Sequence, residues 1–135
     1  MIDQLKNNLT LRPGWMNVVM FFCFYMTFVY LPWDIFVKPI SEDQEVWFGV
    51  LFYGWLAKVG GLFHWVVYGA LFYGMWHMRR WFVMGIMLYL WQVGVSMMLW
   101  NWINEGQPSW FGFLSALVFI LLSYLFYVRK EFFVG

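Results

Sequence analysis

Four long apolar runs, separated by short polar or charged breaks, make up most of this 135-residue chain. They cover residues 15–33, 61–78, 81–102 and 110–127, and aromatic residues bracket each of them. As α-helices, runs of 18 to 22 residues would be about 27 to 33 Å long, which matches the hydrocarbon core of a bilayer. The pattern therefore predicts an all-α integral membrane protein built as a four-transmembrane-helix bundle.

The stretch between the first and second runs is harder to assign. Residues 46–78 contain no acidic residue, and as one helix they would be about 50 Å long, which is too long for a bilayer even with tilt. Gly60 and Gly61 weaken a helix interior, and Lys58 favours the membrane interface. We therefore predict a separate short helix over residues 45–59, interfacial or re-entrant. The alternative is one overlong, tilted second span.

The basic residues predict the orientation of the four spans. Six of the eight Lys and Arg residues fall on one side of a four-span topology, and only Lys38 and Lys58 fall on the other. The six are Lys6, Arg12, Arg79, Arg80, Arg129 and Lys130. Short loops rich in Lys and Arg stay cytoplasmic, so both termini are expected in the cytoplasm. This asymmetry, with an uncleaved first span, predicts a bacterial inner (plasma) membrane protein.

Composition narrows the possible functions. Hydrophobic residues make up 64% of the chain and charged residues 11%, whereas a soluble domain has roughly 25% charged residues. We expect a single membrane domain, residues 1–135, without a soluble domain. A net charge of +1 gives no electrostatic basis for a nucleic-acid partner. The single cysteine, Cys23, excludes dithiol redox catalysis.

Few polar side chains fall inside the predicted spans. No Asp, Glu, Lys or Arg lies in the apolar centre of any span, which argues against an ion pump or channel of the usual kind. Gln92 falls at the middle of the third span. We expect its amide to make an interhelical hydrogen bond, and the alternative is a contact with a ligand.

His64 is the histidine better placed for a functional role. It lies near the outer end of the second span, where a neutral imidazole can act as acid, base or hydrogen-bond partner of a quinone-like head group. A hydrogen bond to a loop carbonyl is the ordinary alternative. His77 is 13 residues away, about 20 Å along a helix, so one metal cannot bind both, and no metal site or cofactor is required. The candidate ligand-binding residues are His64, Lys58, Asp34, Tyr68, Trp65 and Gln92.

The first outer loop carries four acidic residues, at positions 34, 42, 43 and 45. They suggest either a cation site or a solvated acidic loop, and the spacing matches no cation-binding motif, so we favour the loop. Pro32 is expected to kink or end the first helix before Trp33. Asp34 would then hold the helix end against Lys38 or Lys58.

Two pairs of small residues at a spacing of four indicate where helices approach each other. Ala70 and Gly74 lie on the second span, and Gly112 and Ala116 on the fourth. Small residues allow close helix packing in lipid. We expect these faces to pack within the bundle, and dimerisation or docking onto a larger complex is the alternative.

Three functions fit these features. The first is an accessory or scaffold subunit of a larger membrane complex, because the chain is small, has no soluble domain and offers an aromatic surface to another membrane protein or to a second copy. The second is a binder or carrier of an apolar ligand, such as a lipid, quinone or isoprenoid, in an outer-leaflet groove near His64 and Lys58. The third is an enzyme acting on lipid head groups, with His64, Asp34 or Glu45 as acid and base, which no nucleophile supports.

Overall fold

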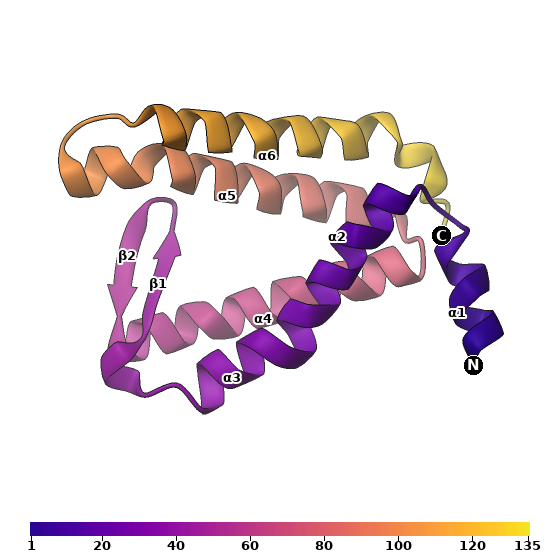
Figure 1. Cartoon of the computed structure of the whole chain (residues 1–135), viewed down its shortest axis with the longest axis horizontal. Coiled ribbons are helices and arrows are strands. Elements are labelled where there is room, and N and C mark those ends of the chain that lie inside the picture. The colour runs from indigo at the N-terminus through magenta and orange to yellow at the C-terminus, as the bar shows by residue number, and fades with distance from the viewer.

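Four helices in the computed structural model, which describes residues 1–135, are long and apolar enough to cross a membrane (Figure 1). They extend over Gly14–Phe36, Gly54–Trp76, Arg80–Glu105 and Trp110–Val128. Their number and length agree with the four apolar runs of the sequence. The chain is therefore a helical protein with the character of a membrane protein.

The first of these helices is composite. A short helix α1 (Ile2–Leu9) precedes it. The span itself consists of α2 (Gly14–Tyr25), a π-helical turn η1 (Met26–Tyr30) and α3 (Leu31–Phe36). A π-helical turn inside an α-helix holds an extra residue and is frequent at functional sites.

The π-helical turn explains how the first span passes Pro32. Proline has no N–H to donate to the preceding turn and its ring crowds that turn, and the wider π-helical turn gives it room. The carbonyl of Thr27 is instead satisfied by the indole N–H of Trp65, at 2.7 Å. The helix continues to Phe36, so the expected end of the helix before Trp33 is wrong.

A β-hairpin occupies the segment between the first and second spans. After a single 3-10 turn, β1 (Gln44–Trp47) pairs antiparallel with β2 (Val50–Tyr53). Phe48 and Gly49 form the two-residue loop, and their φ angles of 50° and 80° are those of a type I′ turn. The separate helix predicted over residues 45–59 is therefore wrong.

Gly60 and Gly61 lie inside the helix α4 (Gly54–Trp76) and do not interrupt it. A Cβ atom at Gly60 would lie 2.8 Å from Nε1 of Trp47, so the absence of a side chain makes room for the hairpin. The two glycines thus give α4 a flat face for β1. An overlong second span is also wrong, since α4 has 23 residues and begins after the hairpin.

The helices α5 (Arg80–Glu105) and α6 (Trp110–Val128) pack side by side along their length (Figure 1). A Cβ atom at Gly112 would lie 2.6 Å from the carbonyl oxygen of Met97, and Gly94 contacts the backbone of Ala116. Gly112 and Ala116 thus lie at the contact between α5 and α6, within one chain.

The helices α4 and α5 meet near the connection between them and diverge toward their other ends (Figure 1). There the hairpin lies across the gap and contacts both helices. A Cβ atom at Gly49 would lie 2.8 Å from Cβ of Leu99 on α5, so the tip of the hairpin is seated on that helix. We call this the hairpin end of the molecule, comprising residues 37–53 and the loop 106–109.

Both chain termini lie at the opposite end, beside the connection 77–79 (Figure 1). Asn8 donates a hydrogen bond from Nδ2 to the carbonyl of Trp76 at 2.9 Å. The backbone N–H of Arg80 donates to the carbonyl of Gly135 at 2.9 Å. We call this the terminal end. Its cytoplasmic location stays a prediction.

The best-packed part of the core lies toward the terminal end. Met16, Met20, Met75, Phe82 and Phe126 are fully buried there, on four different helices. The ring of Phe126 packs edge-on against that of Phe82, with centroids 5.5 Å apart. Closely packed rings hold α2, α4, α5 and α6 together where they converge, which leaves the hairpin end more open.

Candidate ligand-binding cavity

A cavity of about 510 Å³ lies between η1, β1, α4 and α5, where α4 and α5 diverge. Ligand pockets in proteins have volumes of roughly 300–1,000 Å³. Most of its lining is apolar, but it also includes the polar groups of Tyr30, Gln44, Glu45, His64, Tyr68, Tyr89, Gln92 and Ser96. We call it the polar cavity.

Glu45 and His64 face each other at the hairpin side of the polar cavity. Oε2 of Glu45 lies 3.4 Å from Nδ1 of His64, and the two side chains are only 13% and 15% exposed. Glu45 and Trp47 are two residues apart on β1, so their side chains lie on the same face of the strand. That face is turned toward α4. The Trp47 ring packs on the His64 ring, with centroids 4.0 Å apart. The hairpin thus holds a carboxyl group against the imidazole.

Two tyrosines continue this polar wall. Tyr68 lies one turn after His64 on α4, and its hydroxyl accepts a hydrogen bond from the hydroxyl of Tyr89 on α5, at 2.9 Å. Both tyrosine rings meet the His64 ring edge-on, with centroids 6.4 and 5.9 Å away. Three rings from two helices therefore enclose one side of the cavity.

The α5 side of the cavity carries Gln92 and Ser96. The amide Nε2 of Gln92 donates a hydrogen bond to Oγ of Ser96 at 3.1 Å. This bond lies within one helix, so the interhelical hydrogen bond expected for Gln92 is wrong. The other amide atom, Oε1 of Gln92, is buried without a hydrogen-bond partner, and so is Nε2 of His64. Two residues that line the cavity thus each hold a buried polar atom whose hydrogen-bonding capacity is unused.

Burial alters the acidity of Glu45. Its removal from water raises the pKa to about 7, and the nearby negative charges of Asp34 and Asp43 act in the same direction. The positive charge of Lys38 opposes this rise only in part. Glu45 therefore gains or loses its proton near neutral pH, and its charge beside His64 changes there.

Four charged side chains form a compact cluster behind Glu45. Nζ of Lys38 lies 3.0 Å from Asp34 and 3.3 Å from Asp43, and Nζ of Lys58 lies 2.9 Å from Asp43. Both aspartates are only 2% exposed. Burial lowers the pKa of Lys38, but its hydrogen bonds to the two carboxylates outweigh this and raise the pKa. We call these four residues the charge cluster.

The charge cluster corrects one expectation from the sequence and confirms another. Asp34 and Asp43 are buried, so the interpretation of a solvated acidic loop is wrong for them, although Glu42 is exposed. Asp34 does hold the helix end against Lys38, as expected. Two ammonium groups already neutralise the two carboxylates, and a bound cation would have to displace them. Within residues 1–135, no three side chains of His, Cys, Asp or Glu are grouped to hold a metal ion.

The structure separates the six candidate residues into two groups. His64, Tyr68 and Gln92 line the polar cavity. Asp34 and Lys58 belong to the charge cluster instead, and Trp65 turns toward the first span, where its ring packs edge-on against Phe36. Lys58 therefore does not lie at the cavity mouth. Ala70 is exposed, and Gly74 faces the rings of Trp81 and Phe82.

Tyr89 is the cavity residue that sequence reasoning misses. Tyr89, Gln92 and Ser96 follow one another at spacings of three and four on α5, so they share one helix face. That spacing is the one sequence signal for a polar stripe on the third span. The contact between Glu45 and His64 has no such signal, because the two residues lie 19 positions apart on different elements.

Three lining residues remain exposed and mark the mouth of the cavity. Tyr30 on η1 is 38% exposed, Met97 on α5 is 41% exposed, and Gln44 of β1 is exposed beside them. The cavity therefore opens between the π-helical turn and α5, next to the hairpin.

Comparison of the chain with protein-family models, curated proteins and solved structures finds no match. A function must therefore come from the chemistry of the cavity.

Proposed function

We propose that the protein binds a membrane-soluble ligand with an apolar body and a small hydrogen-bonding head group in the polar cavity. A lipid, a quinone or an isoprenoid alcohol has this form. The observation that carries the proposal is that two residues on the lining of one cavity, His64 and Gln92, each hold a buried polar atom without a partner, Nε2 and Oε1 respectively. Leaving a buried polar atom unpaired costs about 1–3 kcal/mol, so a ligand that pairs with both would bind favourably.

The two free atoms define the head group. Oε1 of Gln92 is an acceptor, so it requires a hydroxyl or N–H donor on the ligand. An ionised Glu45 favours the imidazole proton on Nδ1 of His64, which leaves Nε2 as a second acceptor. A protonated Glu45 allows the proton on Nε2, which can then donate to a carbonyl. A head group with two neighbouring hydroxyls fits both states, since it can donate to both acceptors in the first state, and in the second it can donate to Gln92 and accept from His64.

The rest of the lining fits an apolar body. Leu31, Val93 and the side chains of Met26, Met97 and Trp100 line the cavity away from the polar wall. Methionine side chains adapt to irregular shapes, and the tryptophan ring offers a flat contact. With the four helices in a bilayer, the mouth between η1 and α5 would face lipid, and the ligand would enter sideways.

The first test removes the unpaired acceptor atom, Oε1 of Gln92. The binding of farnesol, decylubiquinone and its quinol would be measured by quenching of tryptophan fluorescence in detergent. Gln92→Leu should weaken binding of the hydroxyl-bearing probes about tenfold, the value of one hydrogen bond of about 1.4 kcal/mol. Gln107→Leu is the matched control, since Gln107 is exposed in the loop before α6. Equal affinity in the two variants would contradict the proposal.

The second test fills the cavity. Val93→Trp places a large ring in the lining and should abolish the binding of all three probes. Thermal unfolding followed by circular dichroism would show whether the variant keeps the wild-type fold. Probe binding that persists in a folded Val93→Trp protein would place the ligand elsewhere. Mass spectrometry of organic extracts of the purified protein would identify the native ligand, and an extract without any bound amphiphile would count against the proposal.

The accessory or scaffold subunit remains a prediction from the sequence. Exposed aromatic side chains cover α5 and α6, but contact with lipid requires the same surface. The head-group enzyme gains no support either, since no metal-ligand cluster lies beside Glu45 and His64, and the hydrogen-bond partner of the lining hydroxyl of Ser96 is the amide of Gln92 rather than a base.

A further inference from the structure

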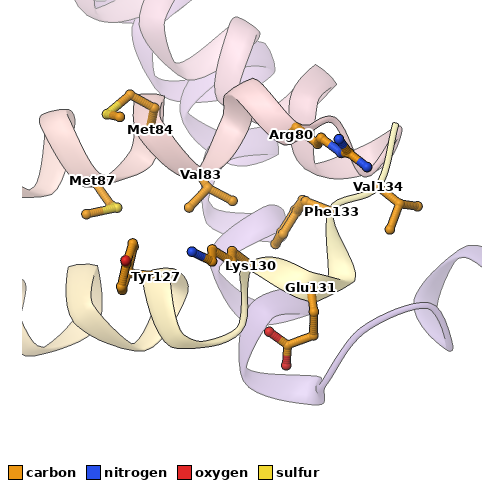
Figure 2. A pocket seen from close by; sticks show the side chains of 9 residues that line it. All are labelled: Arg80, Val83, Met84, Met87, Tyr127, Lys130, Glu131, Phe133 and Val134. Atoms are coloured by element: carbon orange, nitrogen blue, oxygen red, sulfur yellow. The ribbon is translucent and has the colours of Figure 1, made fainter.

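A second cavity lies toward the terminal end and shares no lining residue with the polar cavity. It has a volume of about 450 Å³ and lies between the first turns of α5, the last turn of α6 and the C-terminal segment that follows α6 (Figure 2). Its floor is apolar and includes Val83, Met87 and Phe133. Two basic side chains, Arg80 and Lys130, lie on its rim.

The C-terminal segment is fixed in place, so this cavity is a built feature. Phe133 is only 2% exposed and stacks on Phe82, with ring centroids 4.9 Å apart. The backbone N–H of Gly135 donates to the carbonyl of Met78 at 3.1 Å. The segment thus closes over the start of α5 and forms one wall of the cavity.

The basic groups on the rim have no acidic partner. Nζ of Lys130 lies 4.4 Å from the centre of the Tyr127 ring, and Figure 2 shows it reaching toward the cavity between Tyr127 and Val83. No ion pair engages Arg80 or Lys130. Glu131 also lines the cavity, but its carboxylate lies 3.8 Å from Arg129. Two free positive charges thus lie over an apolar floor.

We propose that this cavity binds an anionic phospholipid, with the charged head group attracted by Arg80 and Lys130 on the rim and an acyl chain on the apolar floor. The proposal rests on the four helices crossing a bilayer, because the rim then lies at the level of the head groups. Basic pockets at the ends of transmembrane helices bind anionic lipid head groups through charge complementarity. The apolar floor extends along α5 toward Met87, in the direction an acyl chain would take.

The test compares two double variants with the same change in charge. Delipidated protein in detergent would be titrated with dioleoylphosphatidylglycerol or dioleoylphosphatidylcholine, and bound lipid counted by native mass spectrometry. The wild type should retain one phosphatidylglycerol in preference to phosphatidylcholine. Arg80→Gln with Lys130→Gln should weaken phosphatidylglycerol binding about 30-fold. Arg79→Gln with Arg129→Gln, both exposed and outside the cavity, should leave it unchanged.

Each other outcome overturns the proposal. Equal losses in the two double variants would mean general attraction to the basic surface, and no loss in either would place the lipid elsewhere. Met87→Trp keeps both charges but fills the floor, and it should also reduce lipid retention. Retention that survives Met87→Trp would contradict the seating of an acyl chain there. Displacement of the lipid by millimolar glycerol phosphate alone would show a site for a free phosphate rather than for a lipid.

Discussion

Both ends of the helix bundle bury charged side chains, but the two ends stabilise these buried charges in different ways. At the hairpin end, the charge cluster pairs two lysines with two aspartates at distances of 2.9 to 3.3 Å. At the terminal end, Arg12 is 4% exposed and has no carboxylate partner. Its guanidinium donates to the carbonyl of Met75 at 3.0 Å and to the side-chain oxygens of Asn8 and Asn17.

The difference shows two ways to hold a charge out of water. The last carbonyls of α4 carry the negative end of the helix dipole, so a guanidinium placed there gains both hydrogen bonds and favourable electrostatics. Burial nevertheless lowers the pKa of Arg12. The charge cluster depends instead on a balance between side chains of opposite sign, and losing any one member leaves a buried charge unpaired.

The largest effect is expected from breaking that balance. Asp43→Ala leaves Lys58 and Lys38 with the Asp34 carboxylate alone, and it should lower the free energy of unfolding by about 3–5 kcal/mol. Chemical denaturation in detergent, followed by circular dichroism, would measure the loss. Glu42→Ala, at the neighbouring exposed position, should change the stability little. Asp43→Ala combined with Lys58→Met should lose less than the sum of the single variants, and strict additivity would argue against a coupled cluster.

Removal of Arg12 tests the other end. Arg12→Met keeps the bulk of the side chain but leaves the carbonyl of Met75 and the amides of Asn8 and Asn17 without their donor. The free energy of unfolding should fall by about 3 kcal/mol, the value of hydrogen bonds to a charged group. Arg129→Met is the control, because Arg129 is exposed and its ion pair contributes little. A loss of stability no larger than that of the control would mean that the contacts of Arg12 do not stabilise the terminal end.

The close contact between the hairpin and α4 can be tested by substitutions on α4 alone. Gly60→Ala places a Cβ atom 2.8 Å from Nε1 of Trp47, so the hairpin must shift, and the stability should fall by about 2 kcal/mol. Gly69→Ala on the same helix meets only Thr27 at 3.6 Å and should be neutral or slightly stabilising. Thermal unfolding of both variants would measure the contrast. Equal effects would mean that the indole of Trp47 does not need the space at Gly60.

The smallest expected effect is a pH dependence at Glu45. Its pKa of about 7 in the folded protein lies above the ordinary value of 4.5, so the stability tied to its neutral form is complete below pH 4.5 and is lost as the pH rises through 7. Glu45→Gln stays neutral, and at pH 8 it should be more stable than the wild type by about 1 kcal/mol, after discounting for partial exposure. Unfolding at pH 4 and pH 8 would show this.

The pH test needs a control for the other ionisable groups around Glu45. Asp34, Asp43, Lys38 and His64 lie near it in both proteins, so only the difference between Glu45→Gln and the wild type is informative. Glu42→Gln should follow the wild-type profile. A Glu45→Gln profile parallel to the wild type at every pH would assign the titration to another group.

The four long helices can be predicted from the sequence because lipid allows few alternatives. A backbone inside a bilayer must satisfy its own hydrogen bonds, so an apolar run of sufficient length is helical. The ends are less certain, since Pro32 lies in the interior of the first span and the π-helical turn compensates for its missing N–H. The presence of a proline at position 32 does not by itself show that a π-helical turn will compensate for the missing N–H.

The hairpin could not be predicted with the same rules. Its strands contain aromatic and β-branched residues in short runs, and periodicity does not separate such a run from a buried helix. The one turn signal is Gly49, and its neighbour Phe48 adopts a positive φ that is rare for an aromatic residue. Gly60 and Gly61 misled the prediction, because a pair of glycines weakens a free helix but also allows another element to pack closely.

The candidate site could be predicted only in part. His64, Tyr68 and Gln92 stand out as polar residues within apolar runs, and the structure brings them to one cavity. The position of Glu45 depends on the hairpin, and the pairing of Lys58 with Asp43 depends on the approach of α4 to the preceding loop. Contacts of this kind follow from tertiary structure and leave no local spacing pattern.

The continuity of the charge cluster has a consequence for biogenesis. All its members lie within residues 34–58, so the translating ribosome delivers them together, and they can neutralise one another once the first turns of α4 have formed. Arg12 instead waits for the far end of α4, some sixty residues later. The growing chain can therefore balance the charges of this cluster before the third and fourth helices leave the ribosome, while Arg12 gains its carbonyl partner only when the second long helix is complete.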